Sequence, residues 1–411
     1  MNIVFGVIIG LLILMGLIVA HEFGHFVMAR RNGVTVKEFG IGFPPRAIAW
    51  VRNPKWVKGS KTEKKWLRLP KTDWQKPQDN LVFSLNWLPI GGFCSMDGES
   101  DADTRKGTFG ATSFWAKTKI LFAGVTMNWL VAIVILTILA WTGMPQFLPN
   151  QFYLGQDASE EIVGHGVIVS KVIEDSPAAR AGFMAGDAVV GVGDGQTVTS
   201  AAEIIDYGKA HAGQTVTYLI ERGEPTTSAT LTATLNPADA EYNLGIEMQE
   251  YGQRFIRSTW SAPIVGVGLT LQLTGETFRG LGQLVWNLVS GVARQFSSNA
   301  DIREDGKQDL ATVGDSVSGP VGIVGVMFPA FAEAGAPNLA FLAALISVSL
   351  ACMNVLPIPA LDGGRWLLIA IYKLRGKKLT KETEEKIVSR AFMVLLALIV
   401  IITVLDIIKI F

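Results

Sequence analysis

The stretch MNIVFGVIIGLLILMGLIVAHEFGHFVMARR, residues 1–31, joins a long apolar segment to a cluster of ionisable side chains. No charged residue lies between Met1 and Ala20, and His21, Glu22 and His25 follow at once. A bilayer core about 30 Å thick requires about 20 apolar residues in helical conformation. The stretch therefore predicts a membrane-spanning helix that ends in ionisable side chains.

The composition is that of a membrane protein with more than one domain. The chain has 411 residues, 49% of them hydrophobic, and a mean hydropathy of +0.34. The formal net charge is zero, so we expect no nucleic-acid partner. The two cysteines, Cys94 and Cys352, are far apart in the sequence, and a disulfide framework is not expected.

Four uncharged stretches are long enough to approach or exceed a bilayer span, and they predict a multi-pass α-helical protein with four transmembrane helices. They are Asn2–Ala20, Ile120–Trp141, Pro337–Leu361 and Ala391–Leu405. The first has no basic segment before it and no small-x-small cleavage site after it, so we do not interpret it as a signal peptide.

A fifth apolar segment, residues 262–292, contains Glu276 and Arg279 near its middle and several glycines. This pattern favours an amphipathic helix pair at a membrane surface over a span.

The charges of the connecting segments predict the orientation. Residues 30–119 hold about 17 Lys and Arg against about 8 Asp and Glu, residues 145–336 about 10 against 22, and residues 373–390 about 7 against 3. The positive-inside rule places the first and third segments in the cytoplasm and the second outside. We therefore expect a multi-pass protein of the cell membrane with both termini outside.

The HEFGH sequence has the spacing of a zinc site. In a helix His21 and His25 lie on one face, about 6 Å apart along the axis, where two imidazoles can hold one zinc ion. Glu22 is turned so that it reaches a metal-bound water and not the metal. The alternative is a helix that leaves the bilayer with polar residues at its end.

A catalytic zinc site normally has three protein ligands. The predicted topology places His165 and His211 on the other side of the membrane. Asp362, in the sequence ACMNVLPIPALDGGRW (351–366), falls at the same depth as HEFGH. Two prolines end the helix before it, and we expect Gly363 and Gly364 to let the backbone turn so that the carboxylate points inward.

HExxH in the first apolar helix, with NVLPIPALDGG (354–364) in a later one, resembles the site-2 protease family of intramembrane zinc metalloproteases (peptidase M50), of the bacterial regulator-of-sigma-E-protease type. The resemblance implies that His21, His25 and Asp362 bind Zn²⁺ and that Glu22 is the general base. It also implies substrates that are single-pass transmembrane proteins, such as anti-sigma factors or signal-peptide remnants.

Further motifs resemble the same family. GFPP (42–45) and PIGGFCSMDGE (89–99) are similar to segments that form a membrane-associated β-structure beside the active site. FAGVTMN (122–128) resembles the second-helix motif, with Val125 where proline is common, and SGPVGI (318–323) matches a later motif. The polar stretch 294–317 is an apparent insertion. The residues expected to bind or position substrate are Asn128, Asn354, Gly91, Gly92 and Phe93.

For Asn128 and Asn354 the sequence leaves two interpretations open. Each amide either holds the substrate backbone and lines a water route, or makes an interhelical hydrogen bond.

Residues 165–198 alternate into short strands with turns at Ser176-Pro177, Gly186-Asp187 and Asp194-Gly195. The order of strand, SPAARAG helix, GD turn and strand resembles one PDZ domain. Such a domain either binds a peptide or C-terminus by strand addition or only filters substrates by size, and the sequence does not choose between these.

The predicted organisation has seven parts. They are the first transmembrane helix with HExxH (1–30), a cytoplasmic-side loop with membrane-associated β-structure (31–115), the second transmembrane helix (116–145), an extracytoplasmic PDZ domain (155–250), an amphipathic region (258–335), the third transmembrane helix with LDGG (337–372) and the fourth (390–411).

Two rival functions follow from the same residues. One is a non-catalytic membrane scaffold that carries a PDZ domain and a structural zinc site. The other is a zinc transporter, which is disfavoured because there is one ligand cluster and no second charged path within the membrane.

Overall fold

The computed structural model describes residues 3–53, 55, 64–71, 74, 80–223, 227–240 and 242–410. Within these residues four helical segments are long and apolar enough to cross a membrane: Ile3–Arg31, Phe114–Thr142, Ala336–Val355 and Lys381–Lys409. The chain divides into two compact units, one of residues 1–144, 150–157 and 258–411 and one of residues 145–149 and 158–257.

The first unit is built on helix α1 (Ile3–Arg31), which packs against α3 (Ala123–Thr142) just after the short helix α2 (Phe114–Leu121). The approach is close at Gly24, where an added Cβ would lie 2.4 Å from the carbonyl oxygen of Ala123. Glycine at this position therefore lets the backbones of α1 and α3 meet at the end of α1 that carries the histidines.

The predicted proline break is present in segment 337–372, which consists of two helices. Helix α10 (Ala336–Val355) ends before Pro357 and Pro359, and α11 (Asp362–Leu374) begins directly at Asp362. Prolines lack a backbone donor and disfavour helical geometry in the residue before them. The break places Asp362 in the first turn of a new helix.

The β-structure of the first unit comprises β1 (Val36–Arg52), β2 (Trp66–Arg68) and β3 (Val82–Met96), in the order β2-β1-β3. Residues 36–41 of β1 pair with 92–96 of β3, residues 46–51 pair with 82–86, and residues 38–41 also face 82–85. Both strands are thus folded back on themselves. Within the described residues, segment 92–96 has a strand partner on one side only and forms a sheet edge.

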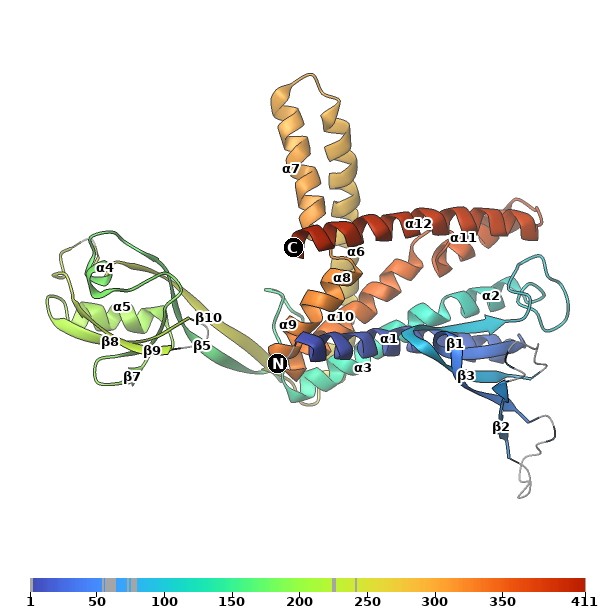
Figure 1. The fold of residues 1–411 in the computed structure, drawn as a ribbon, viewed down its shortest axis with the longest axis horizontal. Helices are drawn as coiled ribbons and strands as arrows, with labels where there is room; N and C mark the ends of the chain where they lie inside the picture. Colours follow the sequence, from blue (N-terminus) through green and yellow to red (C-terminus); the bar gives the residue numbers. More distant parts are fainter. Residues whose placement is uncertain are drawn as a thin grey trace. The chain divides into compact units, whose positions relative to one another are not determined.

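A helical hairpin follows the second unit in sequence (Figure 1). It joins α6 (Ala262–Gln295) to α7 (Ala300–Ser316), with Gly291 packed against Leu310 and an ion pair of 2.9 Å between Arg294 and Asp309. The expected helix pair within 262–292 is wrong. That segment is one helix, because its glycines keep helical dihedrals and its first half packs on α3, where an added Cβ on Gly266 would meet Thr137.

Three short elements lead from the hairpin to α10: α8 (Pro320–Gly322), a π-helical turn η2 (Ile323–Met327) and α9 (Phe328–Glu333). Phe328 and Pro329 of α9 pack on Gly10 and Gly6 of α1. The last helix, α12 (Lys381–Ile410), is exposed along most of its apolar middle. It meets α8 through Asp406, which accepts hydrogen bonds from the backbone N–H groups of Gly319 (3.0 Å) and Gly322 (2.8 Å).

The second unit is a small β-structure with two short helices. Its elements are β4 (Met144–Pro145, at the boundary), β5 (Ser159–Val172), α4 (Pro177–Ala181), β6 (Ala188–Val192), β7 (Gln196–Thr197), α5 (Ala201–Ala210), β8 (Thr215–Arg222), β9 (Thr227–Thr234) and β10 (Ile246–Arg257). The strand order is β4-β10-β5-β6-β8-β9, with β7 beside β6. The expected order of strand, SPAARAG helix, GD turn and strand is present as β5, α4 and β6, around a core that includes Val167, Val189 and Tyr218.

Candidate active site

His21 and His25 lie on one face of α1, toward its end, and both are buried. Their Nε2 atoms are 3.1 Å apart. Nδ1 of His25 is 2.8 Å from the carbonyl oxygen of Ile120, a bond in which the ring must donate. Nδ1 of His25 therefore carries a proton, and in the neutral ring this leaves the lone pair on Nε2, the atom that faces His21 and Asp362.

Asp362 completes the cluster from the first turn of α11. Its Oδ2 lies 3.2 Å from Nε2 of both His21 and His25, and the ligand atoms of the three residues lie within 4.8 Å of one another. Oδ2 is buried and has no hydrogen bond of acceptable geometry. Three converging atoms of this chemistry, one of them without a hydrogen-bond partner, fit a zinc ion bound by two imidazoles and one carboxylate.

Asn128 of α3 is fully buried behind His21, where its amide nitrogen lies 3.3 Å from Nδ1 of the ring. Its Oδ1 has no partner in this orientation. Turning the amide by 180° places Oδ1 against the Nδ1–H group of His21 as an acceptor, and this bond leaves the lone pair of the neutral ring on Nε2. We assign this orientation, because it gives His21 the same form as His25. The backbone carbonyl of Asn128 also accepts a 2.8 Å bond from Ser347 of α10.

A cavity of about 270 Å³ opens beside the three residues. Glu22 lines it, as do Asn354 at the end of α10 and Cys94 of β3. Glu22 is hydrogen-bonded to the backbone of Cys94. Burial, followed by the charges of Glu22 and Glu99, raises the pKa of Cys94 to about 12, so its side chain is a neutral thiol. The carboxylate of Glu22 therefore lies in the same cavity as His21, His25 and Asp362.

The model of peptidase family M50 matches residues 9–55 and 57–399. The chain belongs to this family. It is therefore a zinc-dependent metalloprotease, and its apolar helices make it an intramembrane protease.

Several M50 relatives are similar along most of the chain. A putative zinc metalloprotease of Clostridium perfringens is 28% identical over 403 residues, which cover 98% of each chain. The zinc metalloprotease RasP of Geobacillus kaustophilus is 24% identical and also covers 98% of each chain. The chloroplastic membrane metalloprotease ARASP of Arabidopsis thaliana is 27% identical over 94% of this chain and 75% of its own.

Among solved structures, the PDZ domain of an SdrC-like protein from Listeria monocytogenes is 30% identical to a part of the chain. It covers 20% of this chain and 86% of that domain, with a TM-score of 0.18.

One residue of the protease that the sequence did not single out is Gly124, inside the FAGVTMN motif. A Cβ added there would lie 2.5 Å from Nε2 of His21 and 2.6 Å from Nε2 of His25. Only glycine lets α3 pass this close to the two imidazoles. The signal in the sequence was a glycine within an apolar helix, but nothing local says what such a glycine touches.

Gly363 and Gly364 were expected to let the backbone turn. Both instead have helical geometry in the first turn of α11. An added Cβ would lie 2.1 Å from the carbonyl oxygen of Val355 at Gly363 and 2.0 Å from that of Ile358 at Gly364. The expectation was wrong about the reason: these glycines let α11 pack against the chain that leaves α10, and this packing sets the position of Asp362.

Gly91, Gly92 and Phe93 lie on β3 where it passes over α1. A Cβ on Gly92 would be 3.1 Å from a methyl group of Val19 and 3.0 Å from the carbonyl oxygen of Gly40. Phe93 stacks on Phe43, with ring centroids 6.3 Å apart. The two glycines therefore hold the edge segment of β3 against the last turn of α1 before the histidines.

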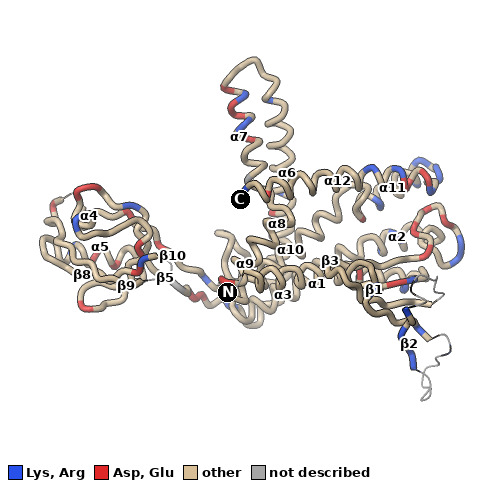
Figure 2. The backbone as a smooth tube through the Cα atoms, in the orientation of Figure 1, with Lys and Arg blue, Asp and Glu red and all other residues tan. Residues whose placement is uncertain are grey.

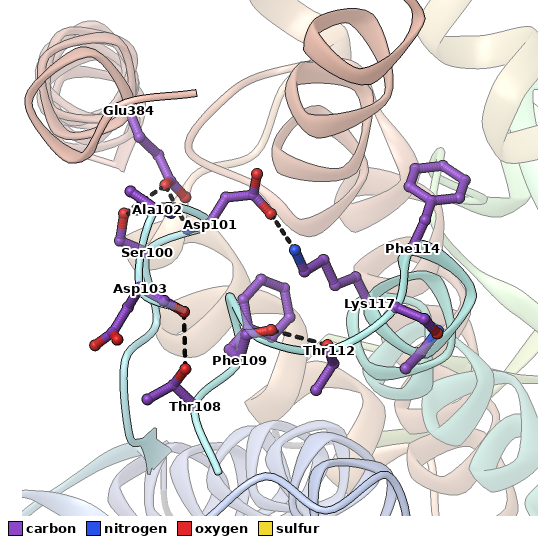
Figure 3. Close-up of polar contacts among 12 residues, drawn as sticks. Ser100, Asp101, Ala102, Asp103, Thr108, Phe109, Thr112, Phe114, Lys117 and Glu384 are labelled. Carbon is purple, nitrogen blue, oxygen red and sulfur yellow. Dashed lines mark hydrogen bonds and ion pairs between the residues drawn. The ribbon is translucent and has the colours of Figure 1, made fainter. Parts of the chain in front are cut away.

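Arg365, one turn after Asp362, is a second residue that the sequence did not indicate. It lines the cavity, and its guanidinium lies 5.1 Å from the ring centre of Phe109 and donates to the carbonyl of Glu99. Its Nε also donates to Glu384 of α12. Figure 3 shows the other contacts of Glu384, with the hydroxyl of Ser100 and the backbone N–H of Asp101. This network fixes the loop after β3, α11 and α12 around the cavity.

Proposed function

We propose that this M50 protease cleaves transmembrane segments of single-pass membrane proteins, within the membrane. The observation that carries the proposal is the convergence of His21, His25 and Asp362 at the end of an apolar helix, next to a cavity lined by Glu22. Burying ionisable side chains at the end of an apolar helix costs free energy, so their presence there indicates a function.

His21, His25 and Asp362 are the proposed ligands of the zinc ion. When bound, zinc supplies Lewis-acid polarisation of the scissile carbonyl and of a water molecule. Asn128 holds the ring of His21 and the carbonyl of Ile120 holds that of His25, so both imidazoles are oriented before the metal arrives.

Glu22 is the proposed general base. It lies one residue after His21, in the cavity and outside the ligand group. In this role it takes a proton from the attacking water and delivers it to the nitrogen of the leaving amine. Both proton transfers need a carboxylate that does not bind the metal, such as Glu22. A carboxylate that binds zinc, as proposed for Asp362, is a weaker base because it shares its charge with the metal.

The edge of β3 is the proposed binding place for the substrate backbone. A transmembrane helix has its carbonyls hydrogen-bonded internally, so it must unwind before its peptide bond can react. Segment 92–96 has one free side among the described residues and contains Cys94 and Met96, which line the cavity. Strand addition at this edge, next to Gly91, Gly92 and Phe93, replaces the helical hydrogen bonds that the substrate loses.

The two asparagines have different proposed roles. Asn354 lines the cavity and donates from its amide to the carbonyl of Leu350, which leaves Oδ1 for a substrate N–H group or water. Asn128 is buried behind His21 and does not line the cavity. We therefore assign substrate positioning to Asn354 and orientation of His21 to Asn128.

The charge distribution supports the proposed orientation in a cell membrane. The site lies at the end of the bundle that carries the lysine-rich α11–α12 connection, which the positive-inside rule places in the cytoplasm. The second unit and both termini then lie outside. In that position a PDZ domain either binds the shortened outer end of a substrate or excludes substrates that still carry a bulky outer domain.

The substrates proposed from the family resemblance are anti-sigma factors and signal-peptide remnants. The alternative function is a non-catalytic scaffold with a structural zinc site. It is disfavoured by the cavity, because structural zinc sites are closed by four protein ligands and the described residues supply three.

The test is cleavage of a model single-pass substrate without its outer domain by purified wild type and Glu22→Gln, with zinc measured in both. We expect the variant to keep zinc and lose at least about 100-fold in rate. Glu304→Gln, at an exposed glutamate of α7, is the matched control and should cleave normally. Equal cleavage by wild type and Glu22→Gln would reject Glu22 as the base, and zinc binding without cleavage in wild type would favour the scaffold.

A further inference from the structure

A second pocket, of about 610 Å³, lies between α2, α11 and the connection from α11 to α12. Five lysines line it: Lys117, Lys373, Lys377, Lys378 and Lys381. This pocket shares no lining residue with the cavity beside His21, His25 and Asp362. Figure 2 shows basic residues gathered at this end of α11 and α12, while α3 carries none along its length.

Three of the five ammonium groups have no carboxylate partner among the described residues. Lys117 forms an ion pair with Asp101, as Figure 3 shows, and Lys381 lies 3.8 Å from Glu385. Lys373 rests over the ring of Phe114, 4.2 Å from its centre, and Lys377 and Lys378 are exposed. The one carboxylate that lines the pocket, Asp101, is the partner of Lys117. The pocket therefore has a surplus of positive charge.

The surroundings of the pocket are those of a membrane interface. Its walls include the apolar side chains of Phe114, Ile369 and Leu379. Beside it Trp115, at the start of α2, is 71% exposed, and Leu374, at the end of α11, is 87% exposed. Exposed tryptophan and leucine next to lysines at the ends of membrane helices are typical of the headgroup level of a bilayer.

We propose that this pocket binds the headgroup of an anionic phospholipid. The lysines contact the phosphodiester, and the apolar wall and exposed Leu374 follow the glycerol and the first part of the acyl chains. Basic pockets between transmembrane helices on the cytoplasmic side are suited to such headgroups. A soluble phosphate uses the same lysines but gains nothing from the apolar wall, and for this reason the lipid is the assigned ligand.

The pocket touches the network that borders the active site. Asp101 lines the pocket and donates its backbone N–H to Glu384 over 2.9 Å. Glu384 in turn accepts from Arg365, one turn after Asp362. A bound lipid therefore holds α2 and the α11–α12 connection together next to the contacts that position α11.

The test is a lipid titration of the detergent-solubilised full chain, followed by native mass spectrometry. Phosphatidylglycerol and phosphatidylcholine with the same acyl chains are compared. We expect one phosphatidylglycerol to bind with at least about 10-fold preference. Because each lysine at a membrane surface contributes about 1 kcal/mol, Lys377→Gln/Lys378→Gln should weaken binding about 10- to 30-fold.

Two control variants make the result specific. Lys377→Arg/Lys378→Arg keeps the charge and should keep the preference. Lys64→Gln/Lys65→Gln removes two exposed lysines outside the pocket and should bind like wild type. Equal affinity for the two lipids, or unchanged binding by Lys377→Gln/Lys378→Gln, would overturn the proposal. Displacement of the lipid by an equal concentration of glycerol phosphate or of an acidic peptide would also overturn it, in favour of a soluble ligand.

Discussion

Arg365 of α11 donates from Nε to Oε1 of Glu384 of α12 over 3.3 Å. Both side chains are largely withdrawn from solvent, at 22% and 5% exposed. Glu384 also accepts 2.9 Å bonds from Ser100 and the N–H of Asp101. One carboxylate of α12 thus contacts two other segments beside the cavity, α11 and the loop after β3, although the middle of α12 is otherwise exposed.

Replacing Glu384 with alanine should destabilise the protein by about 2 kcal/mol, because a partly buried guanidinium and a backbone N–H lose their acceptor. Thermal unfolding in detergent measures this, with Glu385→Ala as the control. Glu385 is 66% exposed and its ion pair is 3.8 Å long, so that change should stay within about 0.5 kcal/mol. Equal unfolding midpoints for the two variants would show that the network contributes nothing.

Gly124→Ala should impair zinc binding. The new Cβ would lie 2.5 Å from Nε2 of His21, closer than real contacts, so α3 or the imidazole must move. A displacement of about 1 Å at the ligands should cost about 100-fold in cleavage rate. Zinc content and rate are measured together.

Gly280→Ala is the matched control for Gly124→Ala. It lies in α6 with nothing within 4 Å of an added Cβ and should stabilise the helix by up to about 1 kcal/mol. Full zinc occupancy and full activity in Gly124→Ala would contradict the close approach of α3 to the ligands.

Asn128→Ala should lower zinc affinity about 10- to 100-fold, because the ring of His21 loses the partner that fixes its tautomer. Asn128→Asp should keep most of the affinity, since a carboxylate also accepts from Nδ1–H. Competition with a zinc chelator measures both. If Asn128→Asp is as weak as Asn128→Ala, the amide donates to the ring and the assigned orientation is wrong.

The convergence of His21, His25 and Asp362 was predictable from short-range patterns. HExxH places two imidazoles on one face of any helix, and the topology predicted from the loop charges placed Asp362 at the same depth. Arg365 and Glu384 were not predicted, because charges at helix ends are usually solvated and only the folded structure pairs them. The course of α6 was wrongly predicted for a similar reason: glycines lower helix propensity, but packing of Gly266 on α3 outweighs that preference.

Asp157 should make stability depend on pH in acid. Partial burial raises the pKa of Asp157, but hydrogen bonds from the side chains and backbones of Ser261 and Thr259 outweigh it and hold the pKa well below its usual value. Because the folded pKa is the lower one, the stabilisation is present above the unfolded value of about 3.9 and is lost as the pH falls below it.

In Asp157→Asn this contribution is absent at every pH. The unfolding midpoint of wild type should therefore exceed that of Asp157→Asn at pH 6, and the difference should shrink between about pH 4 and pH 2. Asp194→Asn, at an exposed turn aspartate, serves as the control and should follow wild type throughout. If the difference in unfolding midpoint between wild type and Asp157→Asn stays constant down to pH 2, the charge of Asp157 does not stabilise its contacts with Thr259 and Ser261. Neutral hydrogen bonds would then suffice there.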